Sequence, residues 1–505
     1  MPEELSHKRI VINAIAATAQ VIVVGVSYVF LYIYLLRTLG ESQLGVYTLV
    51  LSTSSIASLA NFGITSSLVK FVADYRLKAN HEELNKLIFT SLISLIVFFA
   101  ALIMVAYAFG WFIIEHVVEI DKDYVQLALR ILPYSLLCLF INELGGVFIS
   151  ILEGSQRNYI RNIIYIVNNL LFLVLTFVLV PKYGLVGVAY AQVVQSSLIS
   201  IAGFFTGKSL LKDFNIFKWN WDKAIFKEII AYGSKFQVVS IFQMLYEPAT
   251  KTLLTKFAGL PAAAYYDMAT RLVNQLRGLI ANANQVLIPV IAHAAQNHMD
   301  EVRSLYRKAL SITLTANIFL ISAILGFGSL ISFFWIGHQE PKFVFPLCVL
   351  SISLFVNILS GPAFFCSLGE GKMNLLVMIN FFIAVANITG GILLGFLWGG
   401  KGVILSWGIS YAVGSLALII LYQKGIKVKF RDVFSIKEDA VFFLISVVYC
   451  AVTVYIFNHF NIQYNLKTLL INIVIYLVIF IPNIFLNKNL KLITQKLLHR
   501  NTDKD

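Results

Sequence analysis

Long apolar segments follow one another along nearly the whole chain, separated by short polar breaks. A helix needs about 20 apolar residues to cross the hydrocarbon core of a bilayer, and the sequence supplies about fourteen such segments. They lie near residues 10–36, 44–69, 86–114, 125–152, 159–180, 185–206, 228–255, 263–292, 307–334, 343–366, 373–397, 403–422, 439–459 and 466–486. None shows the alternating pattern of a membrane barrel strand, so the backbone polar groups have to be satisfied inside helices. The sequence therefore predicts an all-α integral membrane protein.

Composition agrees with a chain that is solvated mainly by lipid. Hydrophobic residues make up 59% of the sequence and charged residues only 13%, whereas charged residues make up about 25% of a soluble domain. The first segment begins directly after Lys8 and Arg9 and is longer than the apolar core of a signal peptide. We therefore expect it to be retained as the first transmembrane helix.

The positive charges indicate how the chain is oriented. The formal net charge is +13, but most of the Lys and Arg residues lie in alternate breaks, on the side of the N-terminus. This distribution is typical of the positive-inside rule and argues against nucleic-acid binding. We expect a multi-pass protein of the inner (cytoplasmic) membrane with both termini in the cytoplasm.

The chain also resembles itself at an offset of about 218 residues, a period that indicates an internal duplication. Five landmarks recur in chain order: Arg37 to Gly40 with Lys256 to Gly259, Tyr47 with Tyr266, Glu83 and Gly110 with Glu301 and Gly328, Glu153-Gly154 with Glu370-Gly371, and Gly184 and Gly187 with Gly399 and Gly402. Six segments per repeat give two parallel bundles, which can rock around a central site by alternating access. The expected organisation is an N-terminal six-helix bundle (1–207), a cytoplasmic linker (208–227), a C-terminal six-helix bundle (228–424), two further helices (438–486) and a cytoplasmic tail (487–505).

Signatures of catalysis and of metal binding are missing from the sequence. The four cysteines lie in apolar segments without a C-x-x-C pair: Cys138, Cys348, Cys366 and Cys450. We find no Gly-rich nucleotide loop, metal-ligand cluster or nucleophile next to a base. We therefore expect no metal, no cofactor and no catalytic residue, and a transporter rather than an enzyme.

Ionisable side chains inside apolar segments mark the candidate site. Each costs about 2.5–3.5 kcal/mol near the bilayer centre, so it is expected to face protein or water rather than lipid. Segment 263–292 carries a continuous polar face, in which Asp267 can pair with Arg271 four residues later. Arg271 lies about 15 Å beyond Pro261, near the membrane midplane. The candidate substrate-binding residues are Arg271, Lys235, Arg277, Lys251, Arg130, Asn274, Asn282 and Gln285, and the candidate coupling residues are Glu247, Asp267 and Glu143.

Two interpretations of these polar residues remain open. The uncharged ones can simply make interhelical hydrogen bonds, each worth under about 1 kcal/mol. Alternatively they line a cavity, in which cations outnumber acids. A cationic cavity favours an anionic, phosphate-bearing substrate, because Arg binds phosphate oxygens in bidentate fashion.

Three Gly-anchored stretches, residues 36–47, 61–70 and 183–189, resemble the polysaccharide transporter family. This family comprises the Wzx-type O-antigen and capsule flippases of the multidrug/oligosaccharidyl-lipid/polysaccharide exporter superfamily. The resemblance implies a V-shaped pair of bundles that moves polyprenyl diphosphate-linked oligosaccharide from the cytoplasmic to the outer leaflet. By analogy with the lipid II flippases, segments 439–459 and 466–486 would shape a groove for the lipid tail.

The resemblance also implies the partners and the alternatives. We expect a monomer that binds a lipid-linked oligosaccharide, membrane lipids and a coupling ion, either H⁺ or Na⁺. One alternative is a drug or metabolite cation antiporter of the same superfamily, which would have an acidic cavity. A second alternative is a membrane glycan polymerase or ligase, which would present a large outer loop.

Overall fold

The computed structural model describes most of the chain, and that part is helical. The described ranges are 7–77, 80–118, 120–211, 219–284, 287, 290–291, 294–295, 299–429, 438–459 and 464–486. The helices are α1 (His7–Ser54), α2 (Ile64–Leu77), α3 (His81–Phe112), α4 (Lys122–Gly154), α5 (Asn158–Tyr183), α6 (Leu185–Lys208), α7 (Lys223–Asn284), α9 (Met299–Ile336), α10 (Pro341–Gly369), α11 (Met373–Gly425), α12 (Glu438–His459) and α13 (Leu466–Leu486). A 3₁₀ helix, η1 (Ser55–Asn61), precedes α2, and a π-helical turn, η2 (Ile113–Val117), follows α3. The all-α prediction is confirmed.

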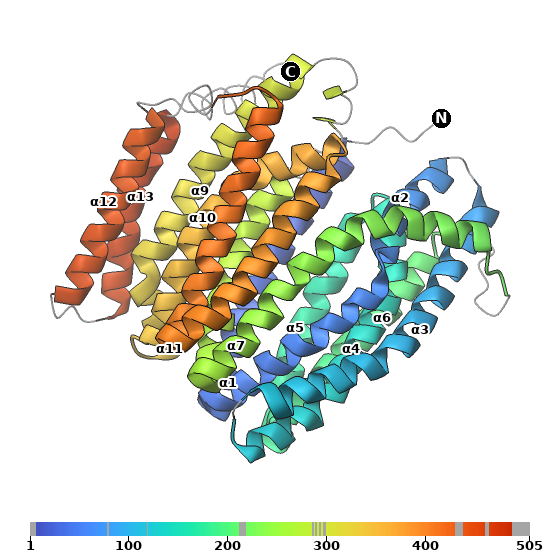
Figure 1. Cartoon of the computed structure of the whole chain (residues 1–505), viewed down its shortest axis with the longest axis horizontal. Coiled ribbons are helices and arrows are strands. Elements are labelled where there is room, and N and C mark those ends of the chain that lie inside the picture. Colours follow the sequence, from blue (N-terminus) through green and yellow to red (C-terminus); the bar gives the residue numbers. More distant parts are fainter. Residues whose placement is uncertain are drawn as a thin grey trace. The chain divides into compact units, whose positions relative to one another are not determined.

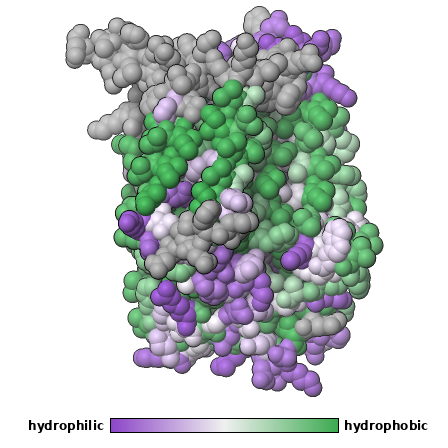
Figure 2. Space-filling view, turned by 90° about the vertical axis from the view of Figure 1, so that its left-hand side faces the viewer, coloured by the Kyte–Doolittle hydropathy of each residue, from purple (hydrophilic) through white to green (hydrophobic). Residues whose placement is uncertain are grey.

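The fourteen predicted segments map onto these helices: segment 44–69 runs from α1 through η1 into α2, α7 and α11 each carry parts of two segments, and each other segment lies essentially in one helix. The chain bends at Gly40 in α1, at Gly259 in α7 and at Gly399 in α11. Nine helices within the described residues are long and apolar enough to cross a membrane. Figure 2 shows hydrophobic residues over a large part of one face, with hydrophilic residues gathered toward its lower edge. The multi-pass membrane prediction is thereby supported.

The chain divides into two compact units. The first comprises Met1–Asp267 with Gly395–Val403, and the second comprises Met268–Leu394 with Ile404–Asp505. The bundle boundaries expected from the sequence stay a prediction, and residues 212–218 of the linker and 487–505 of the tail lie outside the described residues.

In the first unit, α4 packs closely against α6 and α2, and α5 packs against α1 and α6. The beginning of α7 is fixed by Asp222, whose carboxylate accepts the backbone N–H groups of Ala224 and Ile225 at 2.7 and 3.0 Å. The Ile225 N–H holds the pKa of Asp222 below its usual range, since it stabilises the charged form. The backbone N–H of Asp222 also donates to Thr90 Oγ1 at 3.0 Å. This contact attaches the end of the linker to α3.

In the second unit, α12 and α13 lie side by side next to α9 (Figure 1). Tyr449 of α12 fits against Gly326 of α9, where any Cβ would lie 2.3 Å from the ring. The Tyr449 hydroxyl donates to Asn472 of α13 at 3.0 Å, and the Tyr476 hydroxyl lies 3.2 Å from Ser322 Oγ of α9. Buried aromatic packing with satisfied hydroxyl groups therefore holds the two C-terminal helices on α9.

Backbone angles reveal the internal duplication at individual residues. Gly40 has φ 81° and ψ 170°, and Gly259 has φ 80° and ψ 172°. Gly184 has φ 56° and ψ −140°, and Gly399 has φ 60° and ψ −144°. These conformations are open essentially only to glycine. The same unusual bend thus recurs at the matched positions of both repeats.

One predicted landmark is misaligned. At the end of α4 the N–H groups of Ser155, Gln156 and Arg157 donate to Ile151, Glu153 and Leu152. At the end of α10 the N–H groups of Glu370, Gly371 and Lys372 donate to Cys366, Leu368 and Ser367 in the same order. Ser155 therefore corresponds to Glu370, so Glu153-Gly154 does not match Glu370-Gly371. α10 has 29 residues and α4 has 33. Because the matching helices differ in length, one constant sequence offset cannot align both of their ends.

The glycine bends give a prediction about stability. Gly40→Ala and Gly259→Ala should each cost about 1–3 kcal/mol through backbone strain alone. No atom lies within 4 Å of a Cβ at Gly40, and the nearest atom at Gly259 is 3.7 Å away. Gly328→Ala is the matched control, because its Cβ would also meet its nearest atom at 3.7 Å but within a regular helix. Thermal unfolding of the purified protein should show lower midpoints for the first two variants only, and equal midpoints for all three would contradict the bends.

Candidate functional site

A buried ion pair lies at the centre of the polar residues in the first unit. Lys251 Nζ lies 2.5 Å from Asp267 Oδ1, and the two side chains are only 5% and 2% exposed. The other carboxylate oxygen of Asp267 accepts the hydroxyl of Tyr32, which is fully buried in α1. Both charges are thus compensated, as a buried charge requires.

The bend in α7 explains why these two residues meet. Lys251 lies eight residues before Gly259 and Asp267 eight residues after it. Since the chain reverses at this glycine, positions at equal distances from it face each other. Glu247 lies one turn before Lys251, 3.5 Å from its Nζ, with 45% of its side chain exposed. Of the predicted set, the structure brings together these three residues: Lys251, Asp267 and Glu247.

Sequence reasoning missed Tyr32 and the pairing of Lys251 with Asp267. It named Lys251 as a candidate for substrate binding and considered Arg271 as the partner of Asp267. The equal spacing of Lys251 and Asp267 about Gly259 could have indicated the pair. The repeat could have indicated Tyr32, which lies eight residues before Gly40 just as Lys251 lies eight residues before Gly259.

The two predicted arginines of α7, Arg271 and Arg277, belong to the second unit. Arg271, Asn274 and Arg277 are half-buried and follow one another at spacings of three residues. Arg277 has neither a hydrogen bond nor an ion pair within the described part of the chain. The side chains of Lys235 and Asn282, and the whole of Gln285, lie outside the described residues. The predicted role of these residues stays a prediction.

Two predicted residues of α4 lie apart from the ion pair. Arg130 is exposed near the start of the helix, where its charge acts on Tyr190 beside the Tyr134 ring. Glu143 is half-buried further along α4 and accepts the amide of Asn61, the last residue of η1. Among the described residues neither contacts Lys251 or Asp267 directly.

Several uncharged polar residues on other helices bond to the backbone. Asn13 donates to the carbonyl of Gln156 at 3.1 Å and accepts the N–H of Tyr159 at 2.9 Å, which attaches α1 to the turn between α4 and α5. Thr176 and Asn380 donate to carbonyls one turn earlier in their own helices. For these positions the structure favours the interpretation as interhelical and backbone hydrogen bonds.

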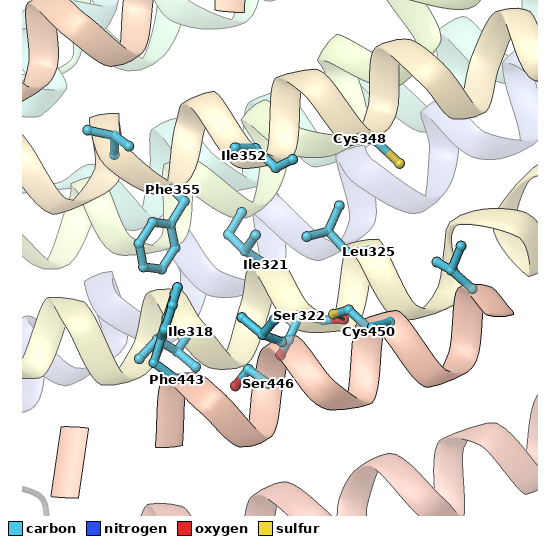
Figure 3. A pocket seen from close by; sticks show the side chains of 14 residues that line it. Ile318, Ile321, Ser322, Leu325, Cys348, Ile352, Phe355, Phe443, Ser446 and Cys450 are labelled. Atoms are coloured by element: carbon cyan, nitrogen blue, oxygen red, sulfur yellow. Dashed lines mark hydrogen bonds between the residues drawn. The ribbon is translucent and has the colours of Figure 1, made fainter. Parts of the chain in front are cut away.

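An apolar cavity of about 530 Å³ lies among α9, α10 and α12 in the second unit (Figure 3). Its lining includes Ile321, Ile352 and Phe443, one from each helix. The polar atoms at its edge turn away from the cavity: Ser446 Oγ donates to the carbonyl of Phe442 at 2.8 Å, and Cys450 Sγ lies 3.6 Å from the carbonyl of Ser322. The cavity therefore suits a hydrocarbon chain rather than a polar ligand.

The Lys251–Asp267 pair gives a second prediction. Lys251→Met leaves the buried carboxylate of Asp267 without its cation, which should cost about 3–5 kcal/mol. The double variant Lys251→Met with Asp267→Asn should recover most of that loss, because the amide still accepts the Tyr32 hydroxyl. Glu247→Gln is the control, since its exposed carboxylate should contribute little. The measurement is the thermal unfolding midpoint of the wild type and the three variants. An unchanged midpoint for Lys251→Met would contradict a stabilising ion pair.

The sequence of the chain is similar to a known protein family and to known transporters. Residues 13–295 match the family model described as "Polysaccharide biosynthesis protein". A putative O-antigen transporter of Shigella flexneri is 23% identical over 397 residues, covering 77% of this chain and 92% of the relative. The multidrug export protein MepA of Staphylococcus haemolyticus is 24% identical over 196 residues, 39% of this chain and 43% of the relative.

Solved structures agree on the fold. The lipid II flippase MurJ in an inward closed conformation superposes with a TM-score of 0.75 over 97% of this chain and 100% of its own, at 15% identity. An inward-facing multidrug transporter of the MATE family, from the MOP superfamily, reaches 0.70 over 80% of this chain and 94% of its own, at 16% identity. The superfamily resemblance noted in the sequence is thereby confirmed. Since the family model covers more than half of its residues, this chain belongs to the polysaccharide biosynthesis protein family of membrane transporters.

Proposed function

We propose that the protein is a flippase, which moves polyprenyl (di)phosphate-linked oligosaccharide from the inner to the outer leaflet by alternating access. The relatives support a transporter of this class. The positive-inside distribution supports placing both termini in the cytoplasm.

The distribution of paired charges carries the proposal. Each of the three acids predicted inside the membrane has a protein partner: Asp267 and Glu247 have Lys251, and Glu143 has Asn61. Arg277 has no such partner among the described residues. A half-buried guanidinium inside a membrane requires an anion, and a diphosphate supplies one with bidentate geometry. A site for a cationic substrate would need the opposite, an acid without a hydrogen-bond or ion-pair partner among the described residues.

The apolar cavity supports the lipid-linked nature of the substrate. Its lining is hydrocarbon from α9, α10 and α12, so it can accept part of a polyprenyl tail without burying an unsatisfied polar group. The two C-terminal helices extend the chain beyond the two repeats, and the lipid II flippase matches essentially the whole chain, including these helices.

A transport assay tests the cationic site. In proteoliposomes that contain a polyprenyl diphosphate oligosaccharide, Arg277→Ala should slow flipping, because a charged hydrogen bond contributes about 1.5–3 kcal/mol, or roughly 10- to 100-fold in substrate affinity. Arg271→Ala should act similarly and Arg277→Lys less severely. Lys424→Ala, at an exposed position at the end of α11, is the control. Normal flipping by both Arg→Ala variants, or uptake of a cationic dye by the wild type, would contradict the proposal.

Filling the apolar cavity tests the lipid tail. Ile352→Trp should reduce flipping of a substrate with a long polyprenyl chain and spare a short-chain analogue, because the indole takes up the space of the tail. Leu393→Trp is the control, since this α11 side chain is 65% exposed and lies outside the cavity. An equal loss for both chain lengths would indicate a folding defect, and no loss for either would exclude the cavity as a tail site.

A further inference from the structure

The two repeats differ at one place inside the membrane. After Gly259, α7 runs as one helix to Asn284, with no further non-helical residue. After Gly40, the matching helix changes to the 3₁₀ segment η1 and then breaks at Phe62 and Gly63, where φ is 48° and 74°. A break at membrane depth is tolerated where the freed backbone groups lie against protein or water.

Glu143 lies directly at this break. The amide nitrogen of Asn61 donates both to Glu143 and to Thr65 Oγ1, the latter at 2.6 Å, while its oxygen accepts the Thr65 N–H at 3.1 Å. Gly146 of α4 allows the close approach, since a Cβ there would lie 3.2 Å from Thr65. The acid also has no counterpart: the second-repeat positions that can match it, Ile358 to Pro362, include no ionisable residue. The break and the acid are thus both special to the first repeat.

We propose that Glu143 is a proton-binding site and that its protonation controls the break at Asn61, thereby coupling a proton gradient to the flipping proposed above. The step is a simple protonation: the carboxylate takes up one proton and becomes a neutral carboxylic acid. Its charge-assisted bond from Asn61 then weakens, because a neutral acceptor binds an N–H donor less strongly.

The fixed orientation of Asn61 favours H⁺ over Na⁺. Because the Thr65 N–H occupies the amide oxygen, the amide N–H groups must point at Glu143. A sodium ion would need oxygen ligands on that side, whereas the structure places donors there. A proton can bind the carboxylate without displacing Asn61.

Tyr165 of α5 is a titratable neighbour of Glu143. The Tyr165 hydroxyl of α5 interacts electrostatically with Glu143 and with Glu153. Glu153 Oε1 in turn lies 2.5 Å from Arg161 Nη1, and the two side chains are 26% and 30% exposed. Under the proposed orientation this end faces the cytoplasm. Within the described residues, Tyr165 is the ionisable group from a neighbouring helix that interacts with Glu143.

The other ionisable groups on the helices around Glu143 lie elsewhere along their helices. Among the described side chains they are Tyr28, Tyr32, Tyr34, Arg37, Glu41 and Tyr47 on α1; Lys70, Asp74, Tyr75 and Arg76 on α2; His81, Glu82, Glu83, Lys86 and Tyr107 on α3; Lys122, Asp123, Tyr124, Arg130, Tyr134 and Cys138 on α4 itself; Tyr159, Arg161, Lys182 and Tyr183 on α5; and Tyr190 and Lys208 on α6.

The break also contacts α7, the helix that carries the buried ion pair. A Cβ at Gly63 would lie 2.4 Å from the carbonyl oxygen of Gly233, so the two backbones touch. Ser67 Oγ, one turn later, donates to the carbonyl of Ile229 at 3.2 Å. α7 brings Lys227, Glu228 and Tyr232 to this contact. A change at Asn61 would therefore reach α7 through direct contact.

Infrared difference spectroscopy on the full-length protein tests proton binding without any substrate. Lowering the pH should produce the C=O stretching band of a protonated carboxylic acid, and Glu143→Gln should remove it. Asn61→Ala keeps Glu143 but removes the amide donor, so the band should persist to higher pH. Glu247→Gln is the control and should retain the band. An unchanged band in Glu143→Gln, or a band that Na⁺ displaces, would overturn the proposal.

Transport then tests coupling. A gradient of one pH unit should bias flipping by about tenfold if one proton is coupled. Glu143→Gln should remove this bias while gradient-independent flipping continues, and a bias that survives in Glu143→Gln would overturn coupling through this residue. The inference rests on the proposed flippase, but the two can fail separately: no flipping by the wild type would refute the function, whereas the infrared band reports on Glu143 alone.

Discussion

The absence of water from the bilayer interior is the constraint on which this structure depends. Every backbone N–H and C=O group inside the membrane has to be satisfied by the chain itself, so helices are the default and each departure from a helix needs a compensating contact. Gly40, Gly259 and Gly399 lie in the breaks between apolar segments, where each leaves the helical conformation at a single residue that only glycine tolerates. The break at Phe62 and Gly63 meets this requirement with contacts from Ser150, Ser67 and Asn61.

The same constraint separates structural charges from functional ones. Lys251 and Asp267 compensate each other inside the protein, and Tyr32 completes the hydrogen bonding of the carboxylate. Breaking such a pair is costly, but the intact pair offers little to a ligand. An ion without an internal partner is costly until a ligand arrives, which makes Arg277 a better candidate for binding than Lys251.

The sequence was sufficient to predict what repeats in the structure. Fourteen apolar segments, the paired glycines at 40 and 259 and at 184 and 399, and the membrane class all follow from periodicity and spacing. It predicted less about which polar residues meet. Lys251 and Asp267 looked like members of separate helix faces, because helix periodicity relates only residues within one helix. Asn61 and Glu143 are 82 residues apart, and no single chain reversal relates their positions in the sequence.

The misaligned landmark at Glu153 shows why a duplicated membrane protein is more than two copies. α10 is shorter than α4, and the positions that could match Glu143 carry no acid. Two identical bundles would respond identically to a proton. In the proposal, protonation of Glu143 changes the stability of the helix break in the first repeat. The corresponding helix of the second repeat has no such acid beside it and does not respond. Under the proposal, the proton acts through Glu143 because an ion can shift an equilibrium only by binding one conformational state better than the other.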